Sequence, residues 1–148
     1  MGAAIHNHQG EIDKYMGDGI MAIFGLKGTE HPAQLAYKAA LEMLERLKTF
    51  NKYLQETYQE TFKVGIGIHY GPVVVGDLGH PDKTSFTAIG DTVNVAARVE
   101  AATKGLCDIL VSQSVYDALN QQDWESRELL LKGKSEILSL YMVPTANS

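Results

Sequence analysis

A first group of residues that could serve catalysis lies at positions 14–19, with the sequence Lys14-Tyr15-Met16-Gly17-Asp18-Gly19. A carboxylate at the tip of a tight hairpin can point into a cleft and bind a hard cation such as Mg²⁺, which prefers oxygen ligands. Asp-Gly pairs are also common in plain type I′ turns, so Asp18 has a purely structural alternative. The spacing alone leaves both interpretations open.

A second polar group lies where a helix is predicted to begin. Asn94 and Arg98 are four residues apart, so they share one face of a helix. A helix start with a nearby guanidinium suits a bound phosphate. The alternative is that Asn94 is a local polar residue near the helix start and Arg98 a solvated surface charge.

A third group consists of Lys132 and Lys134, which flank Gly133 in a predicted loop. Two such lysines could reach a polyphosphate, although a pair of this kind is more often a solvated turn. The five histidines show no spacing that predicts a zinc site. His69 lies in an apolar run and is predicted to be a packed or hydrogen-bonded histidine.

The composition describes one ordered domain that covers residues 1–148. With 45% apolar residues the chain is large enough to bury a core of its own. The net charge of −5 provides no basic field, so nucleic acid is not an expected partner. The single cysteine excludes an internal disulfide. The sequence contains no run of about 20 apolar residues, the length that a membrane-spanning helix needs. We therefore expect a cytoplasmic domain.

Hydrophobic spacing predicts the elements that would position these groups. Alternation of helices and strands predicts an α+β domain. Gly65 and Gly67 mark a bulge or the close approach of another backbone. The predicted elements are a helix end over 1–9, a hairpin over 11–24, a helix over 31–58, strands over 64–71, 72–76 and 83–89, a helix that opens at 90–92 with Asp91 as its N-cap, a strand over 108–111, a helix over 112–119 and two strands around 132–134.

Together, and in this order, the groups resemble the catalytic domain of class III adenylate and guanylate cyclases. The matching stretches are 12–25, 64–79, 86–100 and 131–135, and the resemblance covers essentially the whole chain. It implies a ferredoxin-like βαββαβ core with a C-terminal αβ extension. It also implies a reaction: the ribose 3′-hydroxyl of a nucleoside triphosphate attacks the α-phosphate and pyrophosphate leaves, with two Mg²⁺ or Mn²⁺ ions assisting.

The resemblance also implies a role for each candidate residue. Asp18 looks like one of two metal-binding aspartates. Asn94 looks like the residue that orients the ribose, and Arg98 looks like the one that stabilises charge on the α-phosphate in the transition state. Lys132 looks like a triphosphate contact.

The base is implied by Lys14 and Thr87. A lysine can donate to the N1 edge of adenine, and a threonine hydroxyl can accept from the N6 amine, so the pair favours ATP. A Lys/Thr pair resembles a bacterial, notably cyanobacterial, subgroup that includes bicarbonate-stimulated enzymes, which makes bicarbonate a hypothetical regulator. Alternatives are a guanylyl cyclase, which Lys14 disfavours, and a non-catalytic module for nucleotide binding or dimerisation.

The family works as a dimer with shared sites, so we expect a homodimer in which one subunit supplies the metal aspartates and the other the remaining residues. The sequence departs from the family pattern at its start, where the first strand, most of the first two helices and the first metal aspartate are absent. We expect open strand edges and weak or absent activity of residues 1–148 by themselves. We expect contact with a membrane only through upstream modules.

Overall fold

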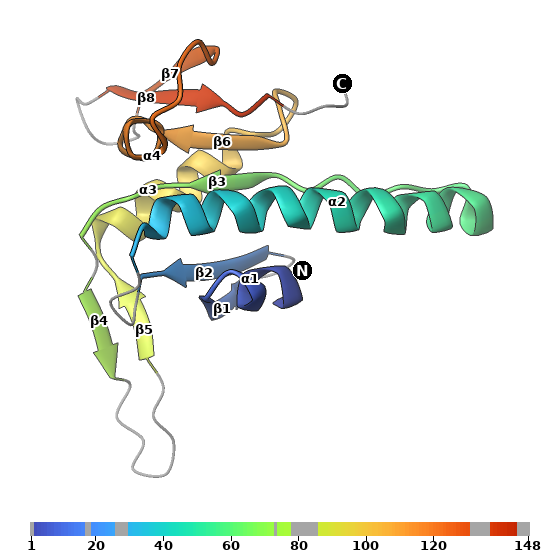
Figure 1. Cartoon of the computed structure of the whole chain (residues 1–148), viewed down its shortest axis with the longest axis horizontal. Coiled ribbons are helices and arrows are strands. Elements are labelled where there is room, and N and C mark those ends of the chain that lie inside the picture. Colours follow the sequence, from blue (N-terminus) through green and yellow to red (C-terminus); the bar gives the residue numbers. More distant parts are fainter. Residues whose placement is uncertain are drawn as a thin grey trace.

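The computed structural model describes residues 2–16, 19–25, 30–72, 74–77, 86–130 and 137–144 (Figure 1). The helices are α1 (Gly2–Asn7), α2 (Pro32–Tyr58), α3 (Asp91–Ala101) and α4 (Gln113–Leu119). The strands are β1 (Gly10–Met16), β2 (Gly19–Phe24), β3 (Ile66–Ile68), β4 (Val74–Asp77), β5 (Phe86–Ile89), β6 (Ile109–Ser112), β7 (Ser126–Leu130) and β8 (Ile137–Met142). This mixed order confirms the predicted α+β class.

The described strands pair in three groups. The largest is a four-stranded sheet in the order β3-β6-β8-β7, in which β3 runs parallel to β6 and the other pairs are antiparallel. The strands β1 and β2 form one antiparallel pair, and β4 and β5 form another. Within the described ranges, β2 pairs only with β1 and β3 only with β6.

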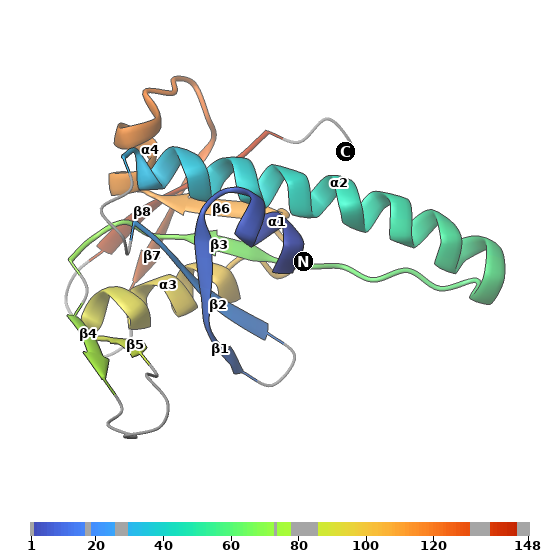
Figure 2. The ribbon, with the colours of Figure 1, turned by 60° about the horizontal axis from the view of Figure 1, so that its bottom comes forward.

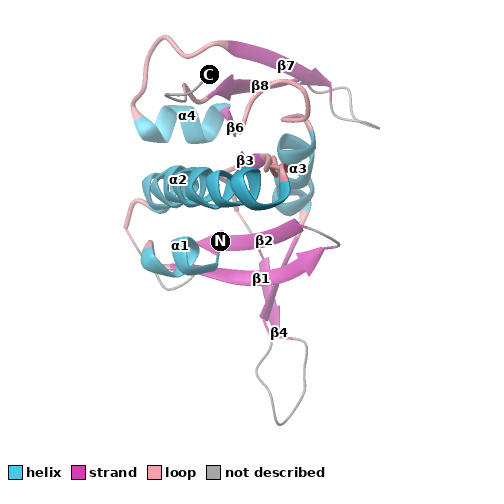
Figure 3. Cartoon of the chain, turned by 90° about the vertical axis from the view of Figure 1, so that its right-hand side faces the viewer, coloured by secondary structure: helices cyan, strands magenta, loops and turns pink. Residues whose placement is uncertain are grey.

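The hydrophobic core consists of two halves, one on each face of the buried strand β6. Ile109 and Val111 pack with residues of α2 and α4, whereas Leu110 between them packs with residues of α3 and β8. Successive side chains of a strand point to opposite faces, so the apolar run Ile109–Val111 of this strand fills both halves. Figure 3 accordingly shows α2 and α3 on opposite sides of β3.

The close approach of α3 to β3 depends on a glycine. A Cβ at Gly67 would lie 2.6 Å from Glu100 Cα, a distance that no ordinary contact reaches. A glycine inside a strand often marks a place where another backbone comes close. The structure therefore confirms the close-approach interpretation of Gly67 and explains how α3 is seated.

The helix α2 continues well past the sheet, and the chain then runs back alongside it to β3 (Figure 2). Asn51 fixes the returning segment with two hydrogen bonds to the backbone of Phe62: its side-chain amide donates to the carbonyl at 2.9 Å, and its side-chain oxygen accepts from the N–H at 2.8 Å. No helix in the described ranges is both long and apolar enough to cross a membrane.

The boundaries differ from the predictions in two informative places. The predicted strand over 64–71 shortens to β3, because its pairing with β6 starts at Ile66 opposite Ile109 and covers three residues. The predicted N-cap Asp91 is wrong, since Gly90 occupies the cap position with a φ of 133° and Asp91 is the first helical residue. In that first turn a carboxylate still faces the positive end of the helix dipole.

Candidate active site

Four of the six predicted site residues lie on elements that are linked by contacts. Lys14 is near the end of β1, Thr87 is on β5, and Asn94 and Arg98 are on α3. The strand β5 contacts both β1 and α3, so it links the lysine-bearing strand to the helix that carries the other two residues. Two further predicted residues, Asp18 and Lys132, lie outside the described residues, and of Thr87 only the backbone is described.

The Thr87 backbone is held in place by its neighbouring strand. Thr87 lies opposite Gly76 in the antiparallel register of β4 and β5. Two positions after the end of β5 the chain enters α3, so the backbone geometry at Thr87 and the start of α3 are tied to each other. A short strand followed directly by a helix is how this sequence brings β5 into contact with α3.

Lys14 lies at an irregularity in β1. The register pairs Ile12 with Ala22 and Lys14 with Met21, which leaves Asp13 as an extra residue in the strand. The Lys14 Nζ lies 3.4 Å from Asp13 Oδ2, and the lysine side chain is 40% exposed while that of Asp13 is 0% exposed. The Lys14 side chain is therefore partly exposed to solvent, and its ammonium group lies next to the buried carboxylate of Asp13.

On α3, the buried residues Val95 and Val99 fix the rotation of the helix. Asn94 and Arg98 each precede one of these valines, so both lie along the edge of the buried face. Asn94 is exposed and Arg98 is half-buried. Within the described part of the chain, Arg98 has no ion-pair partner, so its guanidinium is available for an anionic ligand.

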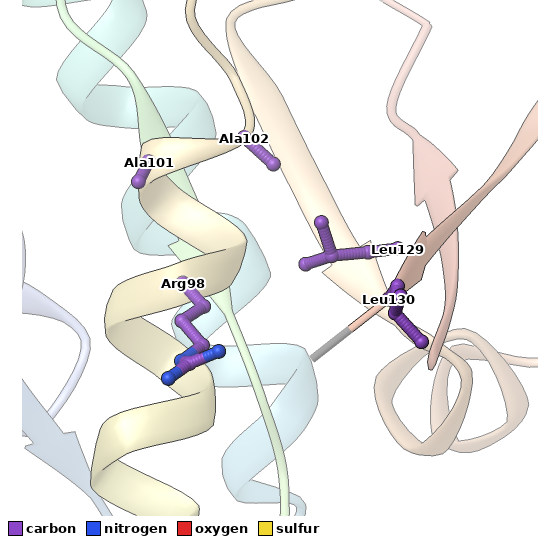
Figure 4. Close-up of a pocket in the computed structure, with 5 residues that line it drawn as sticks. All are labelled: Arg98, Ala101, Ala102, Leu129 and Leu130. Atoms are coloured by element: carbon purple, nitrogen blue, oxygen red, sulfur yellow. The ribbon is translucent and has the colours of Figure 1, made fainter. Parts of the chain in front are cut away.

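Arg98 also borders a pocket between α3 and β7. The pocket has a volume of about 290 Å³, and its other described lining residues are Ala101, Ala102, Leu129 and Leu130. Figure 4 shows the arginine side chain extending along α3, away from Ala101 and Ala102. A helical side chain normally leans toward the N-terminus of its helix, which here carries the guanidinium toward the Asn94 end. Among the described lining residues, all except this arginine are apolar.

The first turn of α3 is tied to the loop that follows β3. The Thr92 hydroxyl donates to the Pro72 carbonyl at 2.5 Å. On the same loop, His69 Nδ1 lies 2.7 Å from Ser112 Oγ, and the Ser114 hydroxyl donates to the Tyr70 carbonyl at 2.7 Å. These bonds connect the end of β3 to α3 on one side and to α4 on the other.

His69 is the hydrogen-bonded histidine that the sequence predicts. Burial lowers its pKa below the usual 6.5, and the carboxylate of Asp91 acts in the opposite direction. The neutral imidazole is therefore the form that the fold favours. His69 supports the backbone near α3 and lies outside the proposed set of nucleotide-binding side chains.

The described residues do not by themselves make up a metal site. Among them, no group of three or more histidine, cysteine, aspartate or glutamate side chains is placed to hold a metal ion. Asp18, the one metal ligand predicted from the sequence, lies outside these residues. Lys14, Asn94 and Arg98 are the predicted site residues whose side chains the structure describes.

Sequence reasoning missed Asp13. The run from Glu11 to Met16 alternates like a regular strand, and in such a strand Asp13 and Lys14 would point to opposite faces. The bulge appears only once the pairing with β2 is known. A carboxylate directly before a lysine in a predicted strand is the one signal that could have drawn attention to the pair.

Comparison with known proteins places this geometry in a family. The sequence profile of the adenylate and guanylate cyclase catalytic domain matches residues 2–144. The adenylate cyclase of Anabaena cylindrica is 41% identical over 153 residues, which cover 97% of this chain and 30% of that protein. The chain thus spans less than a third of this curated relative.

Solved cyclase structures share the fold. The crystal structure of the guanylyl cyclase Cya2 matches 99% of this chain and 77% of its own, with a TM-score of 0.84 and 28% identity. The adenylyl cyclase CyaB from P. aeruginosa matches the same shares with a TM-score of 0.74 and 26% identity. Profile, sequence and fold agree over nearly the whole chain, and the chain belongs to the adenylate and guanylate cyclase catalytic domain family.

Proposed function

We propose that this chain is an adenylyl cyclase catalytic domain, which converts ATP to 3′,5′-cyclic AMP and pyrophosphate. The ribose 3′-oxygen forms a bond to the α-phosphorus, the bond from that phosphorus to the bridging oxygen of pyrophosphate breaks, and the hydroxyl proton leaves to solvent or a base. The observation that carries the proposal is the exposed Lys14 ammonium on β1, a strand in contact with the strand of Thr87.

The choice of ATP over GTP rests on the base edges. Adenine N1 accepts a hydrogen bond, whereas guanine N1 carries a hydrogen, so a lysine donor fits adenine and conflicts with guanine. A threonine hydroxyl at position 87 can accept from the adenine N6 amine. Guanylyl cyclase activity remains the second candidate, because the Cya2 structure with a TM-score of 0.84 is that of a guanylyl cyclase.

The residues of α3 are assigned to the reacting end of the nucleotide. Asn94, exposed at the edge of the helix, is proposed to hold the ribose so that its 3′-oxygen faces the α-phosphate. Arg98, without an ion-pair partner in the described chain, is proposed to meet the charge that develops on the α-phosphate oxygens. Lys132 is proposed to bind the triphosphate.

Two further assignments come from the resemblance. Asp18 is proposed as a ligand for Mg²⁺ or Mn²⁺, ions that neutralise the triphosphate when bound, and no step above depends on it. The domain is proposed to act as a homodimer with shared sites. Bicarbonate regulation, a hypothesis drawn from the Lys/Thr pair, gains no support from the comparisons and is left out of the proposal.

Substitution of Arg98 tests the catalytic role. In the protein at its full encoded length, Arg98→Ala should lower kcat for cyclic AMP formation by about 100-fold to 1000-fold, because it removes a donor that acts mainly in the transition state. The affinity for ATP, measured by calorimetry, should change much less. The control Lys104→Ala removes the same charge from an exposed turn after α3 and should leave kcat unchanged.

Two outcomes would go against this proposal. If Arg98→Ala weakens ATP binding and leaves kcat unchanged, the arginine acts in ground-state binding and has no special role in turnover. If the unsubstituted protein binds ATP and forms no cyclic nucleotide, the non-catalytic binding module is the better description.

A further inference from the structure

The bulge in β1 brings two neighbouring side chains together. In a regular strand, adjacent residues point to opposite faces of the sheet. Here Ile12 pairs with Ala22 and Lys14 with Met21, so Asp13 and Lys14 together oppose a single residue of β2. Such bulges interrupt the alternation and re-aim side chains, often next to functional sites. The result is the 3.4 Å approach of Lys14 Nζ to Asp13 Oδ2.

The two partners differ sharply in exposure. The Asp13 side chain is 0% exposed and the Lys14 side chain is 40% exposed. Burying a carboxylate is costly unless hydrogen bonds or a counter-charge compensate, so an ammonium beside it stabilises the arrangement. The carboxylate in turn occupies a fixed position in the fold, whereas a free lysine side chain samples many rotamers.

An ammonium group has three donors, so a contact with Asp13 leaves donors for a ligand. A lysine held at one side by a buried carboxylate presents its remaining donors in a restricted set of directions. Preorganisation of this kind lowers the entropy that a ligand contact would otherwise cost. For base recognition this matters, because adenine N1 accepts a hydrogen bond whereas guanine N1 donates one.

We propose that Asp13 is a positioning residue for base selection, which holds the Lys14 ammonium in the direction that suits an acceptor at the base edge. This inference rests on the proposed function, in which Lys14 contacts adenine N1. It adds a residue that does not touch the nucleotide and acts through its neighbour in the sequence.

The test compares the ratio of kcat/KM for ATP to kcat/KM for GTP across a double-mutant cycle in the protein at its full encoded length. Asp13→Asn should lower this ratio by about fivefold, near the upper range for a partly exposed ion pair, mainly through a higher KM for ATP. In a Lys14→Met background the same substitution should leave the ratio unchanged, because the group through which Asp13 acts is gone. Glu128→Gln, an equal loss of charge on an exposed strand, is the control.

The outcomes separate this inference from the proposed function. If Lys14→Met does not change the ratio, the assignment of Lys14 to the base is wrong. If Lys14→Met lowers the ratio and Asp13→Asn does not, only the role of Asp13 is wrong. An equal effect of Asp13→Asn with and without Lys14 would mean a general structural role and would also overturn the inference.

A second measurement covers the case in which Asp13→Asn alone does not fold. If the two side chains are paired, Lys14→Met removes a cation from beside the buried carboxylate and should lower the urea midpoint of unfolding, whereas Lys14→Arg keeps the charge and should lower the midpoint less. If the two variants unfold at the same urea concentration, the pairing contributes nothing and the inference fails.

Discussion

At the scale of single residues, the candidate side chains differ in what positions them. The four-residue spacing of Asn94 and Arg98 predicted a shared helix face, and α3 places both along the edge of its buried side. The Lys14 ammonium is exposed, as its proposed role needs, but its contact with Asp13 depends on the β1–β2 register. A register is set by two strands together and has no local sequence signal at a bulge.

His69 gives a residue-scale prediction about pH. Burial lowers its pKa in the folded state, so the unfolded chain binds the proton more readily once the pH falls below about 6.5. The contribution of His69 to the free energy of unfolding is therefore fully present above about pH 6.5. It is lost as the pH falls toward the lower pKa that His69 has in the folded state. Urea midpoints at pH 7.5 and pH 5.5 should differ less for His69→Gln than for the unsubstituted protein.

The matched control for this measurement is His31→Gln, because the His31 residue is exposed. It should keep the pH dependence of the unsubstituted protein. If His69→Gln shows the same loss of stability at pH 5.5 as the unsubstituted protein, the burial of the imidazole does not contribute to the pH response.

At the scale of elements, periodicity identified the long helix and strand pairing decided the rest. Apolar residues at helical spacing predicted a helix over 31–58, and α2 covers Pro32–Tyr58. The strand predicted over 64–71 is only three residues long, because β6 offers partners from Ile109 onward. Gly67 was recognised as a site of close approach, but the identity of the approaching element, α3, required the fold.

Gly67→Ala tests how α3 is seated on β3. The added methyl group meets the Glu100 backbone, which cannot move without shifting α3, so we expect a loss of about 1–3 kcal/mol in the free energy of unfolding. The displaced helix should also lower kcat for cyclic nucleotide formation. Urea denaturation and a cyclase assay measure the two effects.

Gly105→Ala is the comparison variant for this prediction. Gly105 has a φ of 72° and open space around its Cβ position, so alanine there costs about 1 kcal/mol of backbone strain without pushing on α3. Its kcat should stay near that of the unsubstituted protein. A kcat for Gly67→Ala as high as that for Gly105→Ala would show that the exact seat of α3 does not matter for turnover.

At the scale of the whole molecule, the sheets leave edges that the described chain does not cover. The strands β2 and β3 each contact α2 and each pair on one side only within the described residues. Unpaired edges are sites where other strands can add. The resemblance predicted such edges, together with a dimer in which Lys14 and Asp18 serve opposite active sites.

Mixing two inactive variants tests the shared-site dimer. Asp18→Ala and Arg98→Ala should each abolish most activity, and an equal mixture should regain about a quarter, because half of the dimers are mixed and each has one intact site. Mixing Arg98→Ala with Asn94→Ala is the control. These two residues come from the same subunit, so every site keeps a defect and activity should stay low. Recovery in neither mixture would contradict the shared site.

The identity of the cyclic product tests the central claim most directly. The protein at its full encoded length is incubated with ATP and separately with GTP, in Mg²⁺ and in Mn²⁺, and the product is identified by chromatography. We expect cyclic AMP from ATP, with a kcat/KM well above that for GTP, because Lys14 and Thr87 match the adenine edge. Cyclic GMP as the main product would contradict the base assignment, and the absence of both products would contradict a catalytic role.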